Sequence, residues 1–319
     1  MAEPTVSAVV TVYNKAEHVT DTIRSIRGQI DDETDVEYVF VDDASTDGSM
    51  EVVARELRGA PNQQLIWNED NRGPSVRLNQ GGRSASGRYL YFLDADDLAL
   101  RGVVAEMRRL LDHHDADLIY GRSRRFFDDR APDPIPAVDR AAPVEVSDQA
   151  LRHVMRGGFV RMTCMCERDL FHQAGGADET VFIQDESLPI RLAANARRLV
   201  DWRTPVMLQR SERRSADIKA RGSHLSDDKA QMHHDGFLAF RNAIQSLAGT
   251  HADLTPDLYR RALSCYWKHV RASRPHPWLH PAFWHYLKAK GFRLSPDQAV
   301  LDAIAADFAR VPGLRRIQA

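Results

Sequence analysis

The stretch of sequence that decides the fold is Tyr89-Leu90-Tyr91-Phe92-Leu93-Asp94-Ala95-Asp96-Asp97. Its apolar half predicts a buried β-strand, and three carboxylates follow that strand within four residues. Carboxylates this close repel one another, and a divalent cation relieves the repulsion. Oxygen ligands suit Mg²⁺ or Mn²⁺, which also contact substrate phosphates. The alternative is that Asp96 or Asp97 only caps the next helix.

Around this stretch the sequence alternates between strand-like and helix-like patterns. We predict strands at residues 6–13, 36–41, 64–67, 89–93 and 117–120, and helices at 15–28, 47–57, 74–85 and 102–113. Repeated β-α-β units form a mostly parallel central sheet flanked by helices on both faces. The predicted fold class is therefore α/β. Ligands of such sheets bind at the carboxyl ends of the strands.

A second predicted strand also ends in acids. Residues 39–48 carry the pattern V-F-V-D-D-A-S-T-D-G, which places Asp42 and Asp43 at the ligand-binding edge of the sheet. A carboxylate there accepts a hydrogen bond from a nucleobase imide N–H or from a ribose hydroxyl. The alternative is helix capping by Ser45, Thr46 and Asp47, and both roles are compatible because the double aspartate exceeds what capping needs.

Three further segments carry candidate site residues. The first strand closes with T-V-Y-N, in which Tyr13 either stacks on a base or is an ordinary strand-end aromatic. After N-R-G-P at residues 71–74, Arg77 either holds a diphosphate or packs over the sheet edge. Residues 183–192 predict a helix that begins with acids, where Asp185 stays ionised and acts as a general base or simply caps the helix.

Taken in this order, the motifs resemble the bacterial family 2 inverting glycosyltransferases of the GT-A fold, over about residues 5–210. The resemblance implies a nucleotide-sugar site made of Thr11, Tyr13, Asn14, Asp42, Asp43, Arg77, Asp94 and Ala95. It implies that Asp43 contacts the base and that Arg77 lies near the diphosphate or ribose. Two departures stand out: Gln184 replaces the usual acid before the base, and Ala177 replaces a usual aromatic.

The same resemblance implies the metal site and the catalytic base. Asp94 and Asp96 match the D-x-D signature that holds Mn²⁺ or Mg²⁺, and His224 is a further candidate metal ligand. Arg210 is an alternative to His224 as a group that holds the phosphates. Asp185 matches the catalytic base, which deprotonates an acceptor hydroxyl for in-line attack, so that the anomeric configuration inverts.

The implied function is metal-dependent transfer of a sugar from a nucleotide-diphosphate sugar, a UDP-sugar in the first instance, to a glycan or lipid-linked acceptor in surface polysaccharide or glycoconjugate synthesis. Two alternative functions fit the sequence less well. A D-x-D phosphotransferase is disfavoured because Asp97 occupies its Thr/Val position. A non-catalytic nucleotide-binding scaffold of the same fold is disfavoured because the position of the base is filled by Asp185.

The distribution of charge divides the chain. A formal net charge of −2 over 319 residues argues against a nucleic-acid binder. Residues 1–100 hold 9 basic and 18 acidic side chains, whereas residues 101–319 carry a net charge of +7. Regular strand and helix patterning continues to about Gln209, and the sequence after it is polar and then helical. We expect a catalytic domain at 1–215 and a mainly helical C-terminal extension at 216–319 that contacts acceptor, membrane or another subunit.

The extension has an acid-free stretch between Asp257 and Asp297, which holds eight Lys or Arg and three of the five tryptophans. Residues 258–270 show a helical apolar stripe. The stripe either packs on the catalytic domain or a twin subunit, or else 258–296 forms a peripheral contact with a membrane or another anionic partner. The sequence has three cysteines and shows neither a signal-peptide pattern nor an apolar run of membrane length. We therefore expect a cytoplasmic protein. If the segment 258–296 contacts a membrane, we expect the protein at its inner face.

Overall fold

The structure is a computed structural model that describes residues 5–27, 29, 35–127, 130–157, 162–211 and 228–315. Its centre is a nine-stranded sheet in the order β3-β2-β1-β4-β8-β6-β9-β5, with β7 also paired to β9. The strands are β1 Val6–Val12, β2 Val36–Asp42, β3 Gln63–Ile66, β4 Tyr89–Asp94, β5 Leu98–Ala99, β6 Leu118–Phe126, β7 Val144–Ser147, β8 Cys164–Glu167 and β9 Leu199–Arg210.

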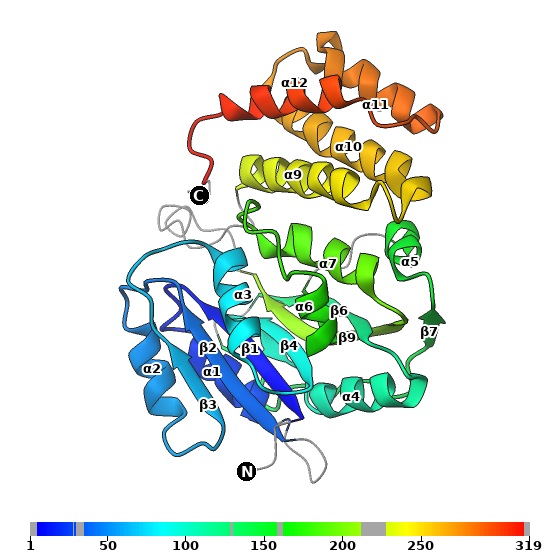
Figure 1. Ribbon diagram of the computed structural model, residues 1–319. Coiled ribbons are helices and arrows are strands. Elements are labelled where there is room, and N and C mark those ends of the chain that lie inside the picture. The colour runs from blue at the N-terminus through cyan, green and yellow to red at the C-terminus, as the bar shows by residue number, and fades with distance from the viewer. Residues whose placement is uncertain are drawn as a thin grey trace.

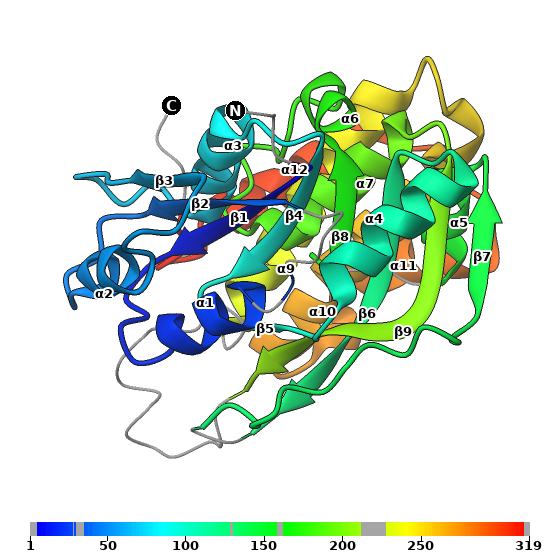
Figure 2. The same ribbon diagram turned by 90° about the horizontal axis from the view of Figure 1, so that it is seen from below.

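Helices cover both faces of this sheet (Figures 1 and 2). They are α1 Val19–Arg27, α2 Ser49–Glu56, α3 Pro74–Ser84, α4 Val103–His114, α5 Ala150–Gly157, α6 Arg168–Gln173, α7 Gln184–Asn195, α9 Lys229–Leu247, α10 Thr255–Ser273, α11 Pro281–Gly291 and α12 Gln298–Ala309, with short 3-10 helices η2 Ala252–Leu254 and η3 Pro277–Leu279. The predicted α/β class is confirmed. None of the described helices is long and apolar enough to cross a membrane.

The first half of the sheet is parallel, as predicted, and the second half is mixed. β1 pairs in parallel with β2 and β4, and β2 pairs in parallel with β3. β8 is antiparallel to both β4 and β6, and β5 and β7 are antiparallel to β9, whereas β6 and β9 are parallel. The expectation of a mostly parallel sheet is thus corrected beyond β4, because strand direction depends on long-range pairing that apolar periodicity does not encode.

Alternating side chains of the central strands enter two separate cores. Val10 belongs to the core that α1, α2 and α4 cover, whereas Val9 belongs to the core beneath α3, α6 and α7. Strands buried on both faces are continuously apolar, which explains the unbroken runs in β1 and β2. Gly81 lets α3 approach closely, since a Cβ there would lie 2.6 Å from the Val9 side chain. This close packing fixes α3 beside the carboxyl ends of β1 and β2.

The C-terminal helices stack on the α7 side of the sheet, and α11 lies in the outermost layer (Figure 1). The predicted helix at 258–270 lies within α10, and its apolar stripe, including Leu258, Leu263 and Tyr266, is buried in the same core cluster as α7 and α9. The alternative in which this stripe packs on the chain itself is therefore confirmed. The proposed boundary between residues 215 and 216 lies outside the described residues.

Candidate active site

A pocket lies at the carboxyl ends of the parallel strands. It is bounded by the ends of β1, β2 and β4, by the last residues of β9, by the first turn of α7, and by parts of α9 and the C-terminal segment. Its lining residues among those described are Thr11, Val12, Tyr13, Lys15, Asp43, Asn71, Pro74, Asp94, Ala95, Asp96, Asp97, Phe182, Ile183, Gln184, Asp185, Glu186, Gln209, Arg210, Met232 and Arg315. The predicted residues that it unites are Thr11, Tyr13, Asp43, Asp94, Ala95, Asp96 and Asp185.

The acidic turn after β4 is held rigidly. Asp94 ends the strand, and the backbone N–H of Asp97 donates to the Asp94 carbonyl at 3.0 Å. From α1, the buried Thr22 hydroxyl contacts the carbonyl oxygens of Ala95 at 3.0 Å and Asp97 at 2.9 Å. The position of each carboxylate is therefore set by the backbone of a closed turn rather than by a flexible loop.

The clustered carboxylates of this turn would be stabilised by a bound cation. Burial, followed by the charges of Asp185 and Asp96, raises the pKa of Asp94 to about 7. Burial and the neighbouring Asp96 also raise the pKa of Asp97 well above its usual value. Carboxylates that ionise with difficulty, at one turn and with oxygen donors only, fit a divalent cation such as Mg²⁺ or Mn²⁺. The residues present therefore match the predicted metal site at Asp94 and Asp96.

Lys15 already brings one positive charge to this turn. Its ammonium Nζ lies 2.7 Å from Oδ2 of Asp96, and both side chains are largely buried. Burial lowers the pKa of Lys15, but the ion pair with Asp96 and the charges of Asp94 and Asp97 outweigh it, so the pKa is raised. Lys15 therefore stays protonated beside the acidic turn. Lys15 was not among the predicted site residues, although it is the single lysine in the acidic first 100 residues of the chain and follows a strand.

Arg210 fixes the end of β9 against the same turn. Its backbone N–H donates to Oδ1 of Asp97 at 2.9 Å, and its guanidinium contacts the Asp96 carbonyl at 3.2 Å and Asp21 of α1 at 3.2 Å. The guanidinium also lies over the Phe126 ring, 4.7 Å from its centroid. Arg210 thus brings a second buried cation to the pocket, and its predicted contact with phosphates stays a prediction.

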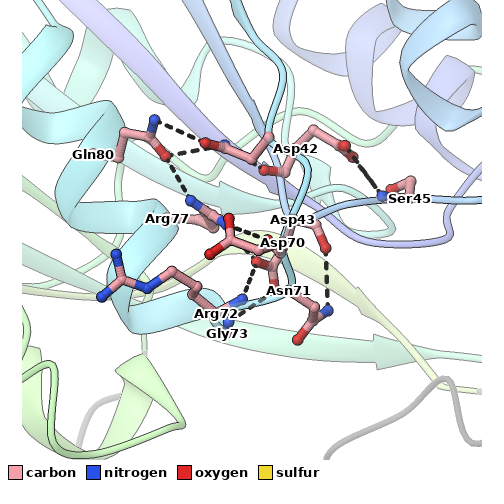
Figure 3. A network of polar contacts seen from close by, with 10 residues as sticks. Asp42, Asp43, Ser45, Asp70, Asn71, Arg72, Gly73, Arg77 and Gln80 are labelled. Carbon is pink, nitrogen blue, oxygen red and sulfur yellow. Dashed lines mark hydrogen bonds and ion pairs between the residues drawn. The ribbon is translucent and has the colours of Figure 1, made fainter. Parts of the chain in front are cut away.

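The Asp43 carboxylate lies at the opposite side of the strand ends (Figure 3). Its Oδ1 accepts from the Arg72 backbone N–H at 2.8 Å and from Arg77 Nε at 2.8 Å, and its Oδ2 accepts from the Gly73 N–H at 2.9 Å. Burial raises the pKa of Asp43, and these donors oppose the shift. Because each carboxylate oxygen has two lone pairs, Oδ2 keeps one acceptor position for a donor in the pocket.

Asn14, Asp42 and Arg77 do not line the pocket in the described part of the chain. Asn14 Oδ1 accepts from the Thr46 N–H at 2.9 Å, and the Asp42 carboxylate accepts from the Ser45 N–H at 3.1 Å, so both shape the loop after β2. The guanidinium of Arg77 is buried between Asp43 and Asp70 (Figure 3). Local partners engage the polar groups of these three residues, and their predicted contact with the nucleotide stays a prediction.

Thr11 and Tyr13 occupy the end of β1. Thr11 is paired in register with Asp94 of β4, and its hydroxyl lies 3.4 Å from Asp94 Oδ1. Tyr13 follows the strand, lines the pocket and is 37% exposed, so part of its side chain is accessible. Side chains on β1 therefore link the acidic turn to the Asp43 side of the site.

Asp185 lies in the first turn of α7, where the helix dipole stabilises a carboxylate. Its neighbour Gln184 donates through Nε2 to Asp94 Oδ1 at 3.2 Å, which ties the helix start to the acidic turn. On the other side, the Ile183 N–H donates to Oδ2 of the fully buried Asp235 on α9 at 2.8 Å. The start of α7 is thus held between the sheet and the C-terminal helices.

The C-terminal segment returns to the same pocket. Gln231 of α9 donates to Asp235 Oδ1 at 2.8 Å and to the Arg315 carbonyl at 3.1 Å, and it accepts from the Arg315 N–H at 2.7 Å. Its side chain is fully buried. The Arg315 guanidinium lies over the Phe182 ring, 5.5 Å from its centroid. No local sequence signal marks Arg315, because more than 80 residues separate it from Met232, the pocket residue that precedes it in the chain.

The predicted ligand His224 lies outside the described residues. A different cluster of Glu145, His153 and Asp201 has side-chain ligand atoms within 4.8 Å of one another. It lies in a separate pocket, and its acids already form ion pairs with Arg122 and Arg203. Because those charges are balanced, the acidic turn after β4 has the stronger electrostatic demand for a divalent cation.

An acidic turn after β4 and an acid at the start of α7, on a sheet of this topology, are features of the GT-A fold. Structures of Staphylococcus aureus TarS residues 1–349 share this fold. The UDP complex has a TM-score of 0.64 at 17% identity over 96% of this chain and 89% of that chain, and the UDP-GlcNAc complex has a TM-score of 0.62 at 14% identity over 99% of each. The mannosyltransferase PcManGT of Pyrobaculum calidifontis with GDP-Man and Mn²⁺ has a TM-score of 0.53 at 17% identity over 97% of this chain and 88% of that chain.

Residues 7–153 match the model of glycosyl transferase family 2, so this segment of the chain is similar to that family. Among named relatives, Bacillus subtilis (strain 168) TuaG, which carries the name of a teichuronic acid biosynthesis glycosyltransferase, is 33% identical over 95 residues, 30% of this chain and 37% of that protein. The poly(ribitol-phosphate) beta-N-acetylglucosaminyltransferase TarS of S. aureus (strain Mu50) is 29% identical over 114 residues, 35% of this chain and 20% of that protein. The matched segments thus span about a fifth to two-fifths of these relatives.

Proposed function

We propose that this chain is an inverting, metal-dependent glycosyltransferase that transfers a sugar from a nucleotide-diphosphate sugar to an acceptor hydroxyl. The observation that carries this proposal is the meeting of Asp43, the acidic turn and Asp185 in one pocket. In this proposal Asp43 suits a nucleobase, the acidic turn suits a metal-bound diphosphate, and Asp185 suits an acceptor hydroxyl. Lys15 and Arg210 supply positive charge between them.

The donor in this proposal is a UDP-sugar. Asp43 offers a carboxylate oxygen of fixed direction to the imide N–H of uracil, and the Tyr13 ring is accessible for stacking on the base. The fold is also that of the TarS structures that contain UDP and UDP-GlcNAc. A hydrogen bond to a charged group contributes about 1.5–3 kcal/mol, enough to distinguish uracil from a base with no donor at that position.

The diphosphate lies in this proposal against the acidic turn. Asp94 and Asp96 hold Mn²⁺ or Mg²⁺, which when bound neutralises the diphosphate and stabilises it as a leaving group. Arg210 contributes a buried guanidinium whose direction is fixed by Asp21 and by the Asp96 carbonyl. Arg315 presents a further cation from the C-terminal segment. These fixed charges stabilise negative charge that develops on the departing nucleoside diphosphate.

Asp185 is the catalytic base in this proposal. It accepts the proton of the acceptor hydroxyl while the hydroxyl oxygen bonds to the anomeric carbon and the bond from that carbon to the diphosphate breaks. Attack from the face opposite the leaving group inverts the configuration. We further propose a glycan or lipid-linked acceptor of surface polysaccharide or glycoconjugate synthesis, and a cytoplasmic location where the three free thiols stay reduced.

The decisive experiment separates donor binding from transfer. Calorimetry with UDP-sugars and GDP-sugars, each with and without Mn²⁺, is expected to show Mn²⁺-dependent binding of a UDP-sugar that Asp96→Ala abolishes. Asp185→Asn is expected to bind the same donor within twofold of the parent while its turnover falls about 10²–10⁴-fold. Metal-independent binding by the parent, or full turnover by Asp185→Asn, contradicts the corresponding assignment.

A further inference from the structure

The surface of the segment that contains η3 and α11 is unusually apolar. In the described residues, five exposed large apolar side chains gather within fifteen positions: Trp278 at 55% exposure, Leu279 at 75%, Trp284 at 56%, Leu287 at 45% and Phe292 at 71%. We call these five residues the α11 face. None of them lies in the pocket of the candidate active site. A concentration of this kind marks a contact with another surface rather than ordinary surface composition.

The geometry of α11 explains why these side chains stay exposed. With 3.6 residues per turn, Ala282, Tyr286 and Ala289 share one side of the helix. Ala282 and Ala289 are buried, and Tyr286 stacks on Trp267 of α10. Helix periodicity places Trp284 and Leu287 on the opposite side, where both are exposed. The helix itself lies in the outermost layer of the molecule (Figure 1). The helix is therefore apolar on both sides, and one side has no covering element in the described chain.

The charged side chains of the segment that holds the α11 face are all basic. Between Asp257 and Asp297 the chain has no acidic residue. Lys288 and Lys290 of α11 are exposed and form no ion pair with any described residue. The acid Asp307 of α12 is already engaged, since it accepts from the Tyr266 hydroxyl at 2.6 Å. Unpaired ammonium groups on the helix that carries Trp284 are complementary to an anionic, partly apolar surface.

We propose that the α11 face binds the surface of an anionic phospholipid bilayer. The tryptophans and their apolar neighbours enter the headgroup region, and Lys288 and Lys290 contact lipid phosphates. α11 has 11 residues, whereas a spanning helix needs about 20, so the contact lies in the plane of the membrane surface. A lipid contact brings a lipid-linked acceptor to the protein without any change in the donor site.

Two other occupants fit these observations less well. A second copy meeting this chain through the same face would bring like charges together, because the 258–296 segment carries no acid to pair with them. Single-stranded nucleic acid uses aromatic and basic groups, but it offers nothing to the aliphatic side chains of Leu279 and Leu287. Both occupants remain outcomes that the experiment can detect.

The test is flotation of the full chain with vesicles of phosphatidylcholine alone or with 30 mol% phosphatidylglycerol. We expect binding to the anionic vesicles only, a loss of at least fivefold for Trp284→Ala combined with Leu279→Ala, and a similar loss for Lys288→Glu combined with Lys290→Glu. All four side chains are exposed, so folding is not at risk. Trp67→Ala, which removes a tryptophan at 53% exposure, and Arg24→Glu combined with Arg58→Glu are matched controls that should bind like the parent.

Three results would overturn the proposal. In the first, the parent does not float with anionic vesicles. In the second, the α11 variants float as well as the parent. In the third, the parent self-associates or binds an oligonucleotide, and the α11 variants abolish that binding while flotation is unaffected. Donor binding by calorimetry, measured without vesicles, is expected to be unchanged in every α11 variant. A failed flotation with intact donor binding therefore leaves the proposed transferase function untouched, and the reverse result does not affect the membrane proposal.

Discussion

The ammonium Nζ of Lys15 lies 2.7 Å from Oδ2 of Asp96, in the turn proposed to hold the metal ion. Lys15 follows β1 in the chain, whereas Asp96 follows β4, and parallel pairing of these strands brings the two together. One positive charge thus already offsets the acidic turn before any metal binds. A divalent cation must share Asp96 with this ammonium, so Lys15 is expected to weaken metal binding in the absence of a donor.

We predict that Lys15→Met binds Mn²⁺ about tenfold more tightly than the parent, because removing a nearby positive charge favours a dication by about 1.4 kcal/mol. The backbone N–H of Lys15 donates to Ser49 Oγ at 2.7 Å, so the loop keeps its position without the ammonium. Calorimetric titration of Mn²⁺ at pH 8 measures the effect. Lys15→Arg is the control and should resemble the parent, whereas weaker Mn²⁺ binding by Lys15→Met contradicts the competition.

The raised pKa of Asp94 predicts a pH dependence of stability. The Asp94 carboxyl holds its proton more tightly in the folded chain than in the unfolded chain, where its pKa has the usual value of 3.8. This protonation therefore stabilises the folded chain at low pH, and the stabilisation is lost as the pH rises through about 7. Without metal, Asp94→Asn should therefore gain in Tm relative to the parent between pH 5 and pH 8. Differential scanning calorimetry of both proteins checks this, and a constant difference in Tm would refute the raised pKa.

The stabilisation by Mn²⁺ should also depend on the ionisation of Asp94. Because the metal requires the ionised carboxylate, Mn²⁺ should raise the Tm of the parent more at pH 8 than at pH 6. In Asp94→Asn the shift caused by Mn²⁺ should be small at both values. A Tm increase that is equal at the two pH values in the parent contradicts the role of Asp94 as a titrating ligand.

Removal of the Arg77 guanidinium should destabilise the fold and also weaken donor binding. Arg77 and Asp43 form a buried ion pair, with side chains 4% and 5% exposed. Arg77→Met leaves Asp43 buried without that partner, which costs about 3–5 kcal/mol of unfolding free energy. Urea denaturation measures the loss. Asp70→Ala is the matched control, because it removes the exposed partner of the same guanidinium and should have a much smaller effect; equal losses would contradict the assignment.

Asp235 should influence turnover without touching the substrate. It accepts the Ile183 N–H at 2.8 Å and so fixes the start of α7, where Asp185 lies. We predict that Asp235→Ala lowers kcat about tenfold, with donor affinity within twofold of the parent, and that Asp235→Asn restores part of kcat because an amide oxygen still accepts. Asp302→Asn on the exposed side of α12 is the control. Loss of donor affinity in parallel with kcat would indicate general disruption instead of positioning.

Part of the site was predictable because it follows strands directly. The acids after β2 and β4 are recognisable as polar residues at the ends of apolar runs, and Asp185 is recognisable as an acid at a helix start. Parallel strands end at a common edge, which brings such residues together. Arg77 and Asp42 had the right residue types for ligand contact. Their contacts with Ser45 and Asp70 were not predictable, because the sequence does not show which of several nearby polar groups each side chain meets.

The sequence by itself determined the α/β class, the helical C-terminal stripe and the acidic edge of the sheet, because periodicity and strand ends are local properties. Only the tertiary structure decided the mixed direction of β8, the ion pair of Lys15 with Asp96 and the return of Arg315 to the pocket. Each of these depends on contacts between residues far apart in the chain, where small differences in packing and charge select one pairing, and no local pattern records that choice.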